Sequence, residues 1–349
     1  MKYDKTFWLA AWVAAAAHGP AAASFQNMPS SIKAEGMGGA FVGMADDSTA
    51  LFVNPAGLTN LERPEMSMMY GKPLYGIEGV NLSNGYATLG VPLNRRFALG
   101  FGAMMFNAAG IISEYEWSGG ASYLITPRVA LGATASYLYH KYDVSSDPAY
   151  SNSGIFQNGD SAGAMSFGVG LMAFASRNLQ FGISGRNLNA PNVSVSGGED
   201  KVARTISVGS MYRTSYANVQ AELEQRNNFT TGAQNTWKLG VEIPLKMLAL
   251  RAGLNTNAVT AGFGVALGNL RLDYAFSMLN QLEASQMGNQ MLAVSYGMGG
   301  NAKAQKSSLE SGTRRSDGYD DVTIPSREGR KVKTRRGEKT RDDGLLWIQ

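Results

Sequence analysis

The chain has 349 residues, no cysteine and a formal net charge of +4 at pH 7. The absence of cysteine excludes a disulfide framework and a thiolate metal site. Glycine is abundant at 42 residues, proline is scarce at 11, and charged residues make up only 17% of the chain. A soluble enzyme of this length should show helical periodicity, and almost none is found between residues 64 and 300.

Residues 1–23 have the pattern of a secretory signal peptide. Two lysines precede an apolar run from Thr6 to Ala17, and a small-residue cleavage site follows, with cleavage expected after Ala23. The alternative is a membrane anchor, but an apolar run of about 12 residues is too short to span a bilayer. The mature chain is therefore expected to be exported.

Residues 24–63 form a second segment, and its most organised stretch runs from Gly36 to Leu58, GMGGAFVGMADDSTALFVNPAGL. It is neither a phosphate-binding loop nor an amphipathic helix of useful length. Asp46 or Asp47 is predicted to cap a short helix that runs through Phe52. Asn54 is predicted to cap a second helix with Pro55 at its first position, where the missing amide hydrogen has no partner to lose.

Residues 64–300 alternate with a period of two, as in Phe97 to Met105 and Met165 to Leu171. Such alternation is typical of β-strands. One face carries large apolar residues, and the other carries small, polar and charged ones. A soluble β-sandwich would show a charged outer face rather than a glycine-rich one, whereas a transmembrane barrel turns its apolar face to lipid. The sequence favours an all-β, antiparallel transmembrane barrel, with the sandwich as the alternative.

The pattern predicts about fourteen strands, an even number as in bacterial single-chain barrels. They are expected at 64–73, 79–92, 95–107, 112–126, 128–143, 161–176, 178–188, 200–213, 217–229, 235–246, 247–256, 258–268, 270–280 and 289–299. Short and long connections alternate, and short turns belong to the periplasm. The longest connection, 144–160, is therefore expected to be extracellular. On the lipid face, Phe101 and Leu239 should meet hydrocarbon, and Tyr115 and Trp117 should sit at the membrane interface.

The small-residue face should line the lumen, and it also carries charges. The candidate lumen charges are Arg186, Glu222, Glu224, Lys238, Arg251, Arg271 and Asp273. Glu222 and Glu224 share a face, but a glycosidase would also need a sugar-binding cleft. Both are interpreted as lumen charges balanced by Lys238, Arg251 or Arg271. His140 is the one histidine outside the signal peptide, and no partner for an acyl-transfer site is found for it. No enzyme activity, cofactor or metal is predicted.

The stretch from Gly36 to Leu61 is expected to fold inside the barrel as a plug. Its motif residues are Gly36, Gly38, Gly39, Asp46, Asp47, Asn54, Pro55 and Gly57. Four apolar residues, Leu51, Phe52, Val53 and Leu58, should pack on the small lumen residues around Gly100, Gly102, Gly168 and Gly170. A carboxylate not used in capping should face Arg186, Arg251 or Arg271. The alternative is a periplasmic lead-in that covers the floor of the barrel.

Residues 301–349 form a basic tail with 12 Lys and Arg against 8 Asp and Glu, which accounts for the net +4 of the whole chain. Its composition indicates a disordered periplasmic segment. It is interpreted either as a solvated linker or as an arm that touches peptidoglycan, anionic lipid or a partner.

The motif made of Gly38-Gly39-Ala40, Asp46-Asp47 and Asn54 to Leu58 resembles the N-terminal signature of the FadL-like outer-membrane transport proteins. The same signature is shared with the PorV/PorQ group, which serves type IX protein secretion, and Leu272 to Ser277 is similar to the C-terminal end of that group.

The resemblance implies a non-enzymatic barrel in the cell outer membrane that passes or binds hydrophobic small molecules through a plugged lumen. The alternative that it implies is a PorV-like accessory or shuttle protein of type IX secretion. The expected partners are outer-membrane lipid, a hydrophobic ligand or a secreted protein, and the barrel assembly machinery. The compartment excludes nucleic acid.

Overall fold

A computed structural model describes residues 25, 30–77, 79, 81–143, 156, 159–229, 232–280 and 288–299. The predicted signal peptide, the basic tail and most of the long connection at 144–160 lie outside these residues. Each of those three predictions therefore remains a prediction.

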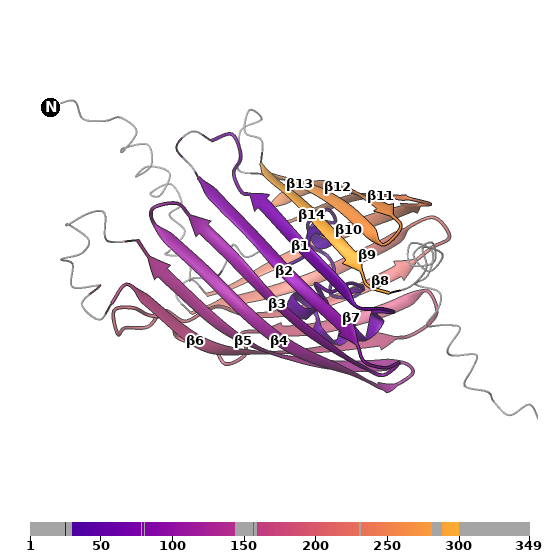
Figure 1. The fold of residues 1–349 in the computed structure, drawn as a ribbon, viewed down its shortest axis with the longest axis horizontal. Helices are drawn as coiled ribbons and strands as arrows, with labels where there is room; N and C mark the ends of the chain where they lie inside the picture. Colours follow the sequence, from indigo (N-terminus) through magenta and orange to yellow (C-terminus); the bar gives the residue numbers. More distant parts are fainter. Residues whose placement is uncertain are drawn as a thin grey trace, which may run out of the picture. The chain divides into compact units, whose positions relative to one another are not determined.

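The described residues contain fourteen strands that close into one antiparallel barrel, in which β1 pairs with β14 and every other pairing joins strands consecutive in sequence (Figure 1). The strands are β1 (Glu65–Lys72), β2 (Leu82–Pro92), β3 (Phe97–Ala108), β4 (Ile112–Thr126), β5 (Val129–Tyr142), β6 (Ser161–Phe174), β7 (Leu179–Arg186), β8 (Arg204–Arg213), β9 (Asn218–Asn228), β10 (Gly232–Leu245), β11 (Leu248–Asn255), β12 (Ala258–Leu267), β13 (Leu270–Leu279) and β14 (Asn289–Gly297). The predicted barrel is confirmed. β8 begins at Arg204 rather than at 200, because Lys201 forms an isolated bridge with Asn192.

The outer face of the barrel is apolar, as the alternation predicts. Phe101 is 53% exposed and Leu239 is 45% exposed, although both are large hydrophobic side chains. Trp117 is also exposed on this face, and its ring stacks between those of Tyr115 and Tyr137 at 5.7 and 6.1 Å. An apolar exterior around a closed sheet suits lipid and argues against the soluble sandwich. Among the described residues, no helix has the length and apolar character needed to cross a membrane.

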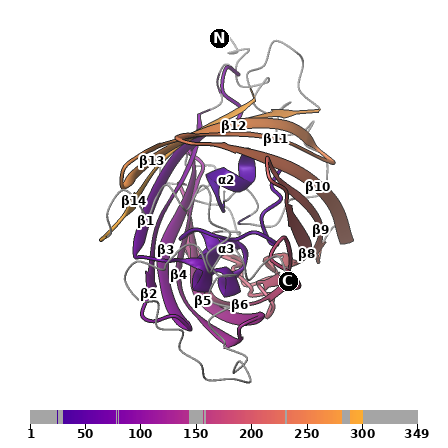
Figure 2. The ribbon, with the colours of Figure 1, turned by 90° about the vertical axis from the view of Figure 1, so that its right-hand side faces the viewer.

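Three short helical elements lie inside the ring of strands, and Figure 2 shows two of them, α2 and α3, within the barrel. They are α2 (Ile32–Glu35), α3 (Ala50–Val53) and the 3-10 helix η1 (Pro55–Asn60). We call residues Ser31 to Leu61, which contain all three, the inner segment. Most of its side chains are buried, and they form the larger apolar cluster of the molecule together with residues from the barrel wall. The expected helical segment inside the barrel is therefore present.

The pairing between β6 and β7 is shorter than the other strand pairings of the barrel. β6 pairs with β7 from Val169 to Phe174 alone. Towards the start of β6, the connection after β7 takes the place of a strand: the Leu188 amide donates to the Phe167 carbonyl, and the Asn189 side chain bonds the backbone of residues 165 and 167. The sheet is thus completed there by side chains and a loop instead of a full ladder.

Candidate functional site

The inner segment begins with helix α2, which Ser31 caps through a hydrogen bond from the Ala34 amide. Gly38 and Gly39 follow, with φ angles of +69° and +85°. A Cβ on Gly38 would come within 2.8 Å of the Leu254 backbone nitrogen and oxygen. Glycine is therefore required at position 38 for two reasons: the backbone is left-handed, and it lies very close to the barrel wall.

The prediction that Asp46 or Asp47 caps the next helix is wrong. Helix α3 starts at Ala50 with Thr49 as its N-cap, and the Thr49 side chain makes no capping bond. Asp47 lies just before this position, and its Oδ1 accepts from the Thr49 amide at 2.9 Å. Asp46 is used elsewhere, since Lys33 reaches it at 2.6 Å.

Asn54 caps η1 as predicted, with Pro55 following it directly. Its Oδ1 accepts from the Ala56 amide at 3.3 Å. Its Nδ2 donates to the Val42 carbonyl at 3.0 Å and to the Leu171 carbonyl of the wall at 3.1 Å. The Asn54 backbone amide ends α3 by donating to the Ala50 carbonyl, while its side chain starts η1 and ties the segment to β6. Gly57 leaves room for Ala45, because a Cβ at position 57 would clash with the Ala45 carbonyl oxygen.

The apolar side chains of the inner segment fit against glycines of the wall. A Cβ at Gly100 would meet Leu58 at 2.9 Å, and one at Gly102 would meet Phe52 at 2.7 Å. Gly170 faces Asn54 and Pro55. A Cβ at Gly168 would meet Thr134 and Gly185 of the wall first, and Gly168 lines a small cavity of about 10 Å³ together with Leu51 and Phe52. Glycines on β3 and β6 therefore widen the lumen where the inner segment lies closest.

Glu222 on β9 joins the wall to the inner segment directly. Its Oε2 accepts from the amides of Phe41 and Val42 at 2.9 and 3.0 Å. Its Oε1 accepts from Lys238 Nζ at 2.9 Å, and the same ammonium reaches Glu224 at 2.7 Å. The predicted balance of the two glutamates by Lys238 is therefore present.

The two arginines proposed as alternative partners for these glutamates pair with other carboxylates. Arg251 bonds Glu242 at 2.8 Å and Asp273 at 2.7 Å. Arg271 bonds Asp273 at 2.7 Å and reaches Asp47 of the inner segment at 3.5 Å. The expected carboxylate facing an arginine is thus Asp47, and a continuous row of charges links it to β10, β11 and β13.

Arg186 and Lys33 also form ion pairs, with Glu116 and Asp46 respectively. Arg186 on β7 reaches Glu116 on β4 at 3.3 Å. In the inner segment, burial acts to lower the pKa of the Lys33 ammonium, but the carboxylates of Asp46, Glu242 and Asp47 outweigh it and the pKa is raised. Lys33 is therefore held in its charged form.

Sequence reasoning missed Glu116, Glu242, Lys33 and Glu35. The first two could have been found from the alternation, because Glu116 shares a strand face with Ser118, and Glu242 shares one with Lys238. Lys33 and Glu35 lie on a helix of four residues, which is too short for periodicity to assign a face.

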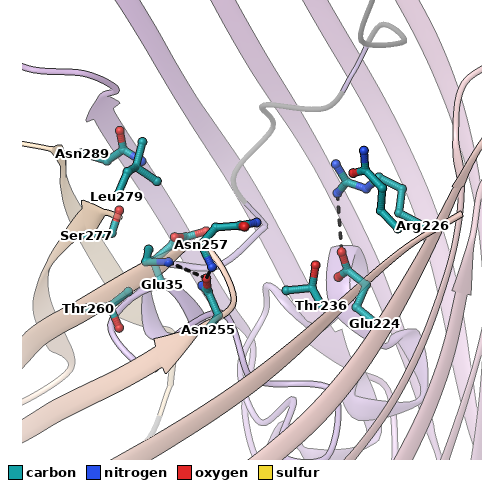
Figure 3. Close-up of a pocket in the computed structure, with 12 residues that line it drawn as sticks. Glu35, Glu224, Arg226, Thr236, Asn255, Asn257, Thr260, Ser277, Leu279 and Asn289 are labelled. Carbon is teal, nitrogen blue, oxygen red and sulfur yellow. Dashed lines mark hydrogen bonds and ion pairs between the residues drawn. The ribbon is translucent and has the colours of Figure 1, made fainter. Parts of the chain in front are cut away.

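A polar cavity of about 230 Å³ lies at the end of the lumen where β11 ends and β12 begins (Figure 3). Glu35 faces it from the inner segment, and Glu224, Arg226, Asn255 and Thr260 face it from the wall. Burial is the main cause that raises the pKa of the Glu35 carboxyl; Lys238 opposes the rise and Glu224 adds to it.

His140 is buried at 1% exposure, and its Nε2 lies 2.7 Å from the Val193 carbonyl oxygen. Its ring also lies 5.9 Å from that of Phe25 and 5.1 Å from that of Tyr142. These contacts give it a packing role at the barrel end. Within the part of the chain that the structure describes, no group of three or more His, Asp or Glu side chains is placed to hold a metal ion.

A closed fourteen-stranded barrel with an apolar exterior and an internal helical segment defines an outer-membrane β-barrel protein. The chain belongs to the family of type IX secretion system membrane proteins PorP/SprF, whose model matches residues 48–296. The predicted link to type IX secretion is confirmed, with PorP/SprF as the family where the motif suggested PorV/PorQ, and the FadL-like resemblance is confirmed at the level of the fold. No curated protein matches the chain in sequence.

Solved structures show the same fold at low identity. The toluene transporter TodX of P. putida is 12% identical, with a TM-score of 0.58 over 77% of this chain and 99% of that one. The toluene transporter TbuX of Ralstonia pickettii is 13% identical, with a TM-score of 0.54 over 76% and 97%. A FadL homologue of Pseudomonas aeruginosa is 12% identical, with a TM-score of 0.53 over 77% and 98%.

Proposed function

We propose that this protein serves type IX secretion as a non-enzymatic barrel whose lumen is closed by the inner segment. The observation that carries the proposal is the family match, which runs from residue 48 in the inner segment to residue 296 in β14. The match therefore includes both the wall and the second half of the segment that fills it.

The lumen supports this reading because it is filled where a hydrophobic ligand would have to pass. Small-molecule sites commonly occupy about 300–1,000 Å³ with mostly apolar linings. The larger described cavity is about 230 Å³ and polar, and the smaller, beside Leu51 and Phe52, is about 10 Å³. A barrel of this kind suits a role in which its surfaces, rather than an open pore, meet a secreted protein.

The route to the membrane follows from the same proposal. Residues 1–23 direct export and are removed, the barrel assembly machinery inserts residues 64–300, and the basic tail at 301–349 remains in the periplasm. Outer-membrane lipid then surrounds the apolar exterior.

The test is a chromosomal deletion in the native bacterium, complemented by the wild-type chain. Proteins secreted through the type IX system should disappear from the medium or the cell surface and return on complementation. Normal secretion in the deletion strain, with the protein confirmed absent, contradicts the proposal. The complemented strain controls for effects on neighbouring genes.

Passage or binding of hydrophobic small molecules is the second candidate function. The incomplete pairing between β6 and β7 favours it. Residues 161–168 of β6 pair with β5 but have no strand partner on the β7 side, and the small cavity beside Leu51 and Phe52 also touches Phe167 and Asn187 there. The Ser166 hydroxyl donates to Asn187 Oδ1 at 2.8 Å. Because the chain has no cysteine, Ser166→Cys with Asn187→Cys can close this place by a disulfide. Oxidation of the double variant should then stop toluene entry into vesicles, and reduction should restore it. If toluene does not enter vesicles that contain the reduced protein, this candidate function is contradicted.

A further inference from the structure

The polar cavity has two sides, and each side carries a carboxylate. In Figure 3, Thr260, Ser277 and Asn289 lie on one side with Glu35 and Asn255 close by, and Glu224 and Arg226 lie on the other. Thr260, Ser277 and Asn289 come from β12, β13 and β14, and the second side comes from β9. Most lining side chains are amides and hydroxyls, which can donate and accept hydrogen bonds but contribute no charge.

The charges of the cavity leave Glu35 without a counter-ion of its own. Across the described residues, the Glu35 carboxylate makes no hydrogen bond and no ion pair. The Lys238 ammonium, whose charge acts on the Glu35 carboxylate, is held by Glu222 at 2.9 Å and by Glu224 at 2.7 Å. Arg226 is turned to Glu224 at 3.7 Å. Two carboxylates and one guanidinium therefore line the cavity, and one negative charge is left over when all three are ionised.

We propose that this cavity is a binding site for a hydrophilic ligand that carries an ammonium or guanidinium group, with Glu35 as the counter-ion and the surrounding amides and hydroxyls as hydrogen-bond partners. A cation placed there restores the charge balance that the wall does not provide. Its hydrogen bonds to a carboxylate would be charge-assisted, and they gain strength where water is partly excluded. Aromatic side chains are not among the residues that line the cavity, so the lining does not offer the stacking surface on which flat ligands rest.

The same chemistry can come from two sources, a free amine or the basic side chain of a peptide. The cavity lies at the barrel end that carries the longer connections, the end expected to face the outside. The proposal does not depend on the role in secretion, because either source could reach the cavity from that side.

The test uses the full-length chain in detergent micelles and isothermal titration calorimetry. The cationic probes are 1,5-diaminopentane and the peptide Gly-Lys-Gly, and the neutral probe is Gly-norleucine-Gly; both peptides are N-acetylated and C-amidated, so that the lysine ammonium is the one charge that distinguishes them. We expect both cationic probes to bind and the neutral peptide to bind at least tenfold more weakly. Tighter binding of Gly-Lys-Gly than of the diamine identifies a peptide as the source, and the reverse order identifies a free amine.

The Glu35→Gln variant should weaken cation binding at least tenfold. Glu199→Gln is the matched control, because the Glu199 side chain is 73% exposed and pairs with Lys201 away from the cavity, and it should bind like wild type. Heat-dependent mobility in SDS gels checks that each barrel is folded. Should Glu35→Gln not fold, the comparison of charged and neutral probes on the wild-type chain decides. Equal binding of all three probes, or no binding at millimolar concentration, or unchanged binding in a folded Glu35→Gln barrel, overturns the proposal.

Discussion

The link between the wall and the inner segment at Glu222 can be tested by the Glu222→Gln variant. In the wild-type chain one carboxylate oxygen accepts from the amides of Phe41 and Val42 at 2.9 and 3.0 Å, and the other accepts from Lys238 at 2.9 Å. Hydrogen bonds to a charged group contribute about 1.5–3 kcal/mol each. Glutamine keeps one neutral acceptor, so we expect a net loss of about 2–3 kcal/mol in the free energy that holds this part of the segment in place.

The loss is measured by amide hydrogen exchange of Phe41 and Val42 in the full-length protein. A change of about 1.4 kcal/mol is tenfold in an equilibrium constant, so exchange of these amides should become about 30- to 150-fold faster. Amides in β3 and β4, on the opposite part of the wall, should keep their protection. Glu199→Gln serves as the control at the barrel end.

Unchanged exchange at both amides in a folded Glu222→Gln barrel would refute the reasoning. It would mean that packing, rather than the carboxylate, holds this part of the segment.

Four further outcomes follow from the same contacts. Leu58→Ala, at a fully buried side chain against Gly100, should lower the free energy of unfolding in urea by about 2–5 kcal/mol; a loss below 1 kcal/mol would contradict the packing. Gly38→Ala should speed proteolysis of the inner segment while the barrel keeps its gel mobility, and equal cleavage would argue against a required left-handed backbone. Leu239→Arg should cost about 2–4 kcal/mol in lipid vesicles if the residue lies near the midplane, with Leu239→Ala as control; equal stability would place it outside the membrane. Because the pKa of the Glu35 carboxyl is raised above 4.5, the folded state binds this proton more tightly, so stability should fall as pH rises above 4.5 and through the folded value. The Glu35→Gln variant should flatten this pH profile, and an unchanged slope would contradict the assignment.

The barrel could be predicted from the sequence because alternation assigns a face to every residue of a strand. Phe101 and Leu239 were expected to face lipid and are exposed on the outside. The same parity placed Glu222 and Arg271 in the lumen, where they now form ion pairs. Closure follows from physics as well, since an open sheet edge leaves backbone groups unpaired in lipid.

The details of the inner segment were harder to predict. Asn54 followed by Pro55 is a local signal, and it marked the start of η1 correctly. Asp46 and Asp47 stand next to each other before a helix, and local rules could not decide between a cap and an ion pair. The choice depends on Lys33 and Arg271, which are brought in by the fold from positions 13 and 224 residues away.

The partners of the lumen charges show the same limit. The alternation predicts which side chains enter the lumen. It does not predict which of them lie within contact distance on neighbouring strands. Arg251 pairs with Glu242 and Asp273 on the strands beside it, and this requires the strand register. The polar cavity likewise is lined by residues of a helix and several strands. It could not be predicted from any single stretch of sequence.

The measurement that bears most directly on the central claim is electrical conductance in planar lipid bilayers, compared between the full-length chain and a variant that lacks residues 30–60. If the inner segment closes the lumen, the full-length barrel should be silent and the deletion variant, shown to be folded by its gel mobility, should conduct steadily. A full-length barrel that conducts as well as the deletion variant, or a folded deletion barrel that stays silent, would contradict the claim.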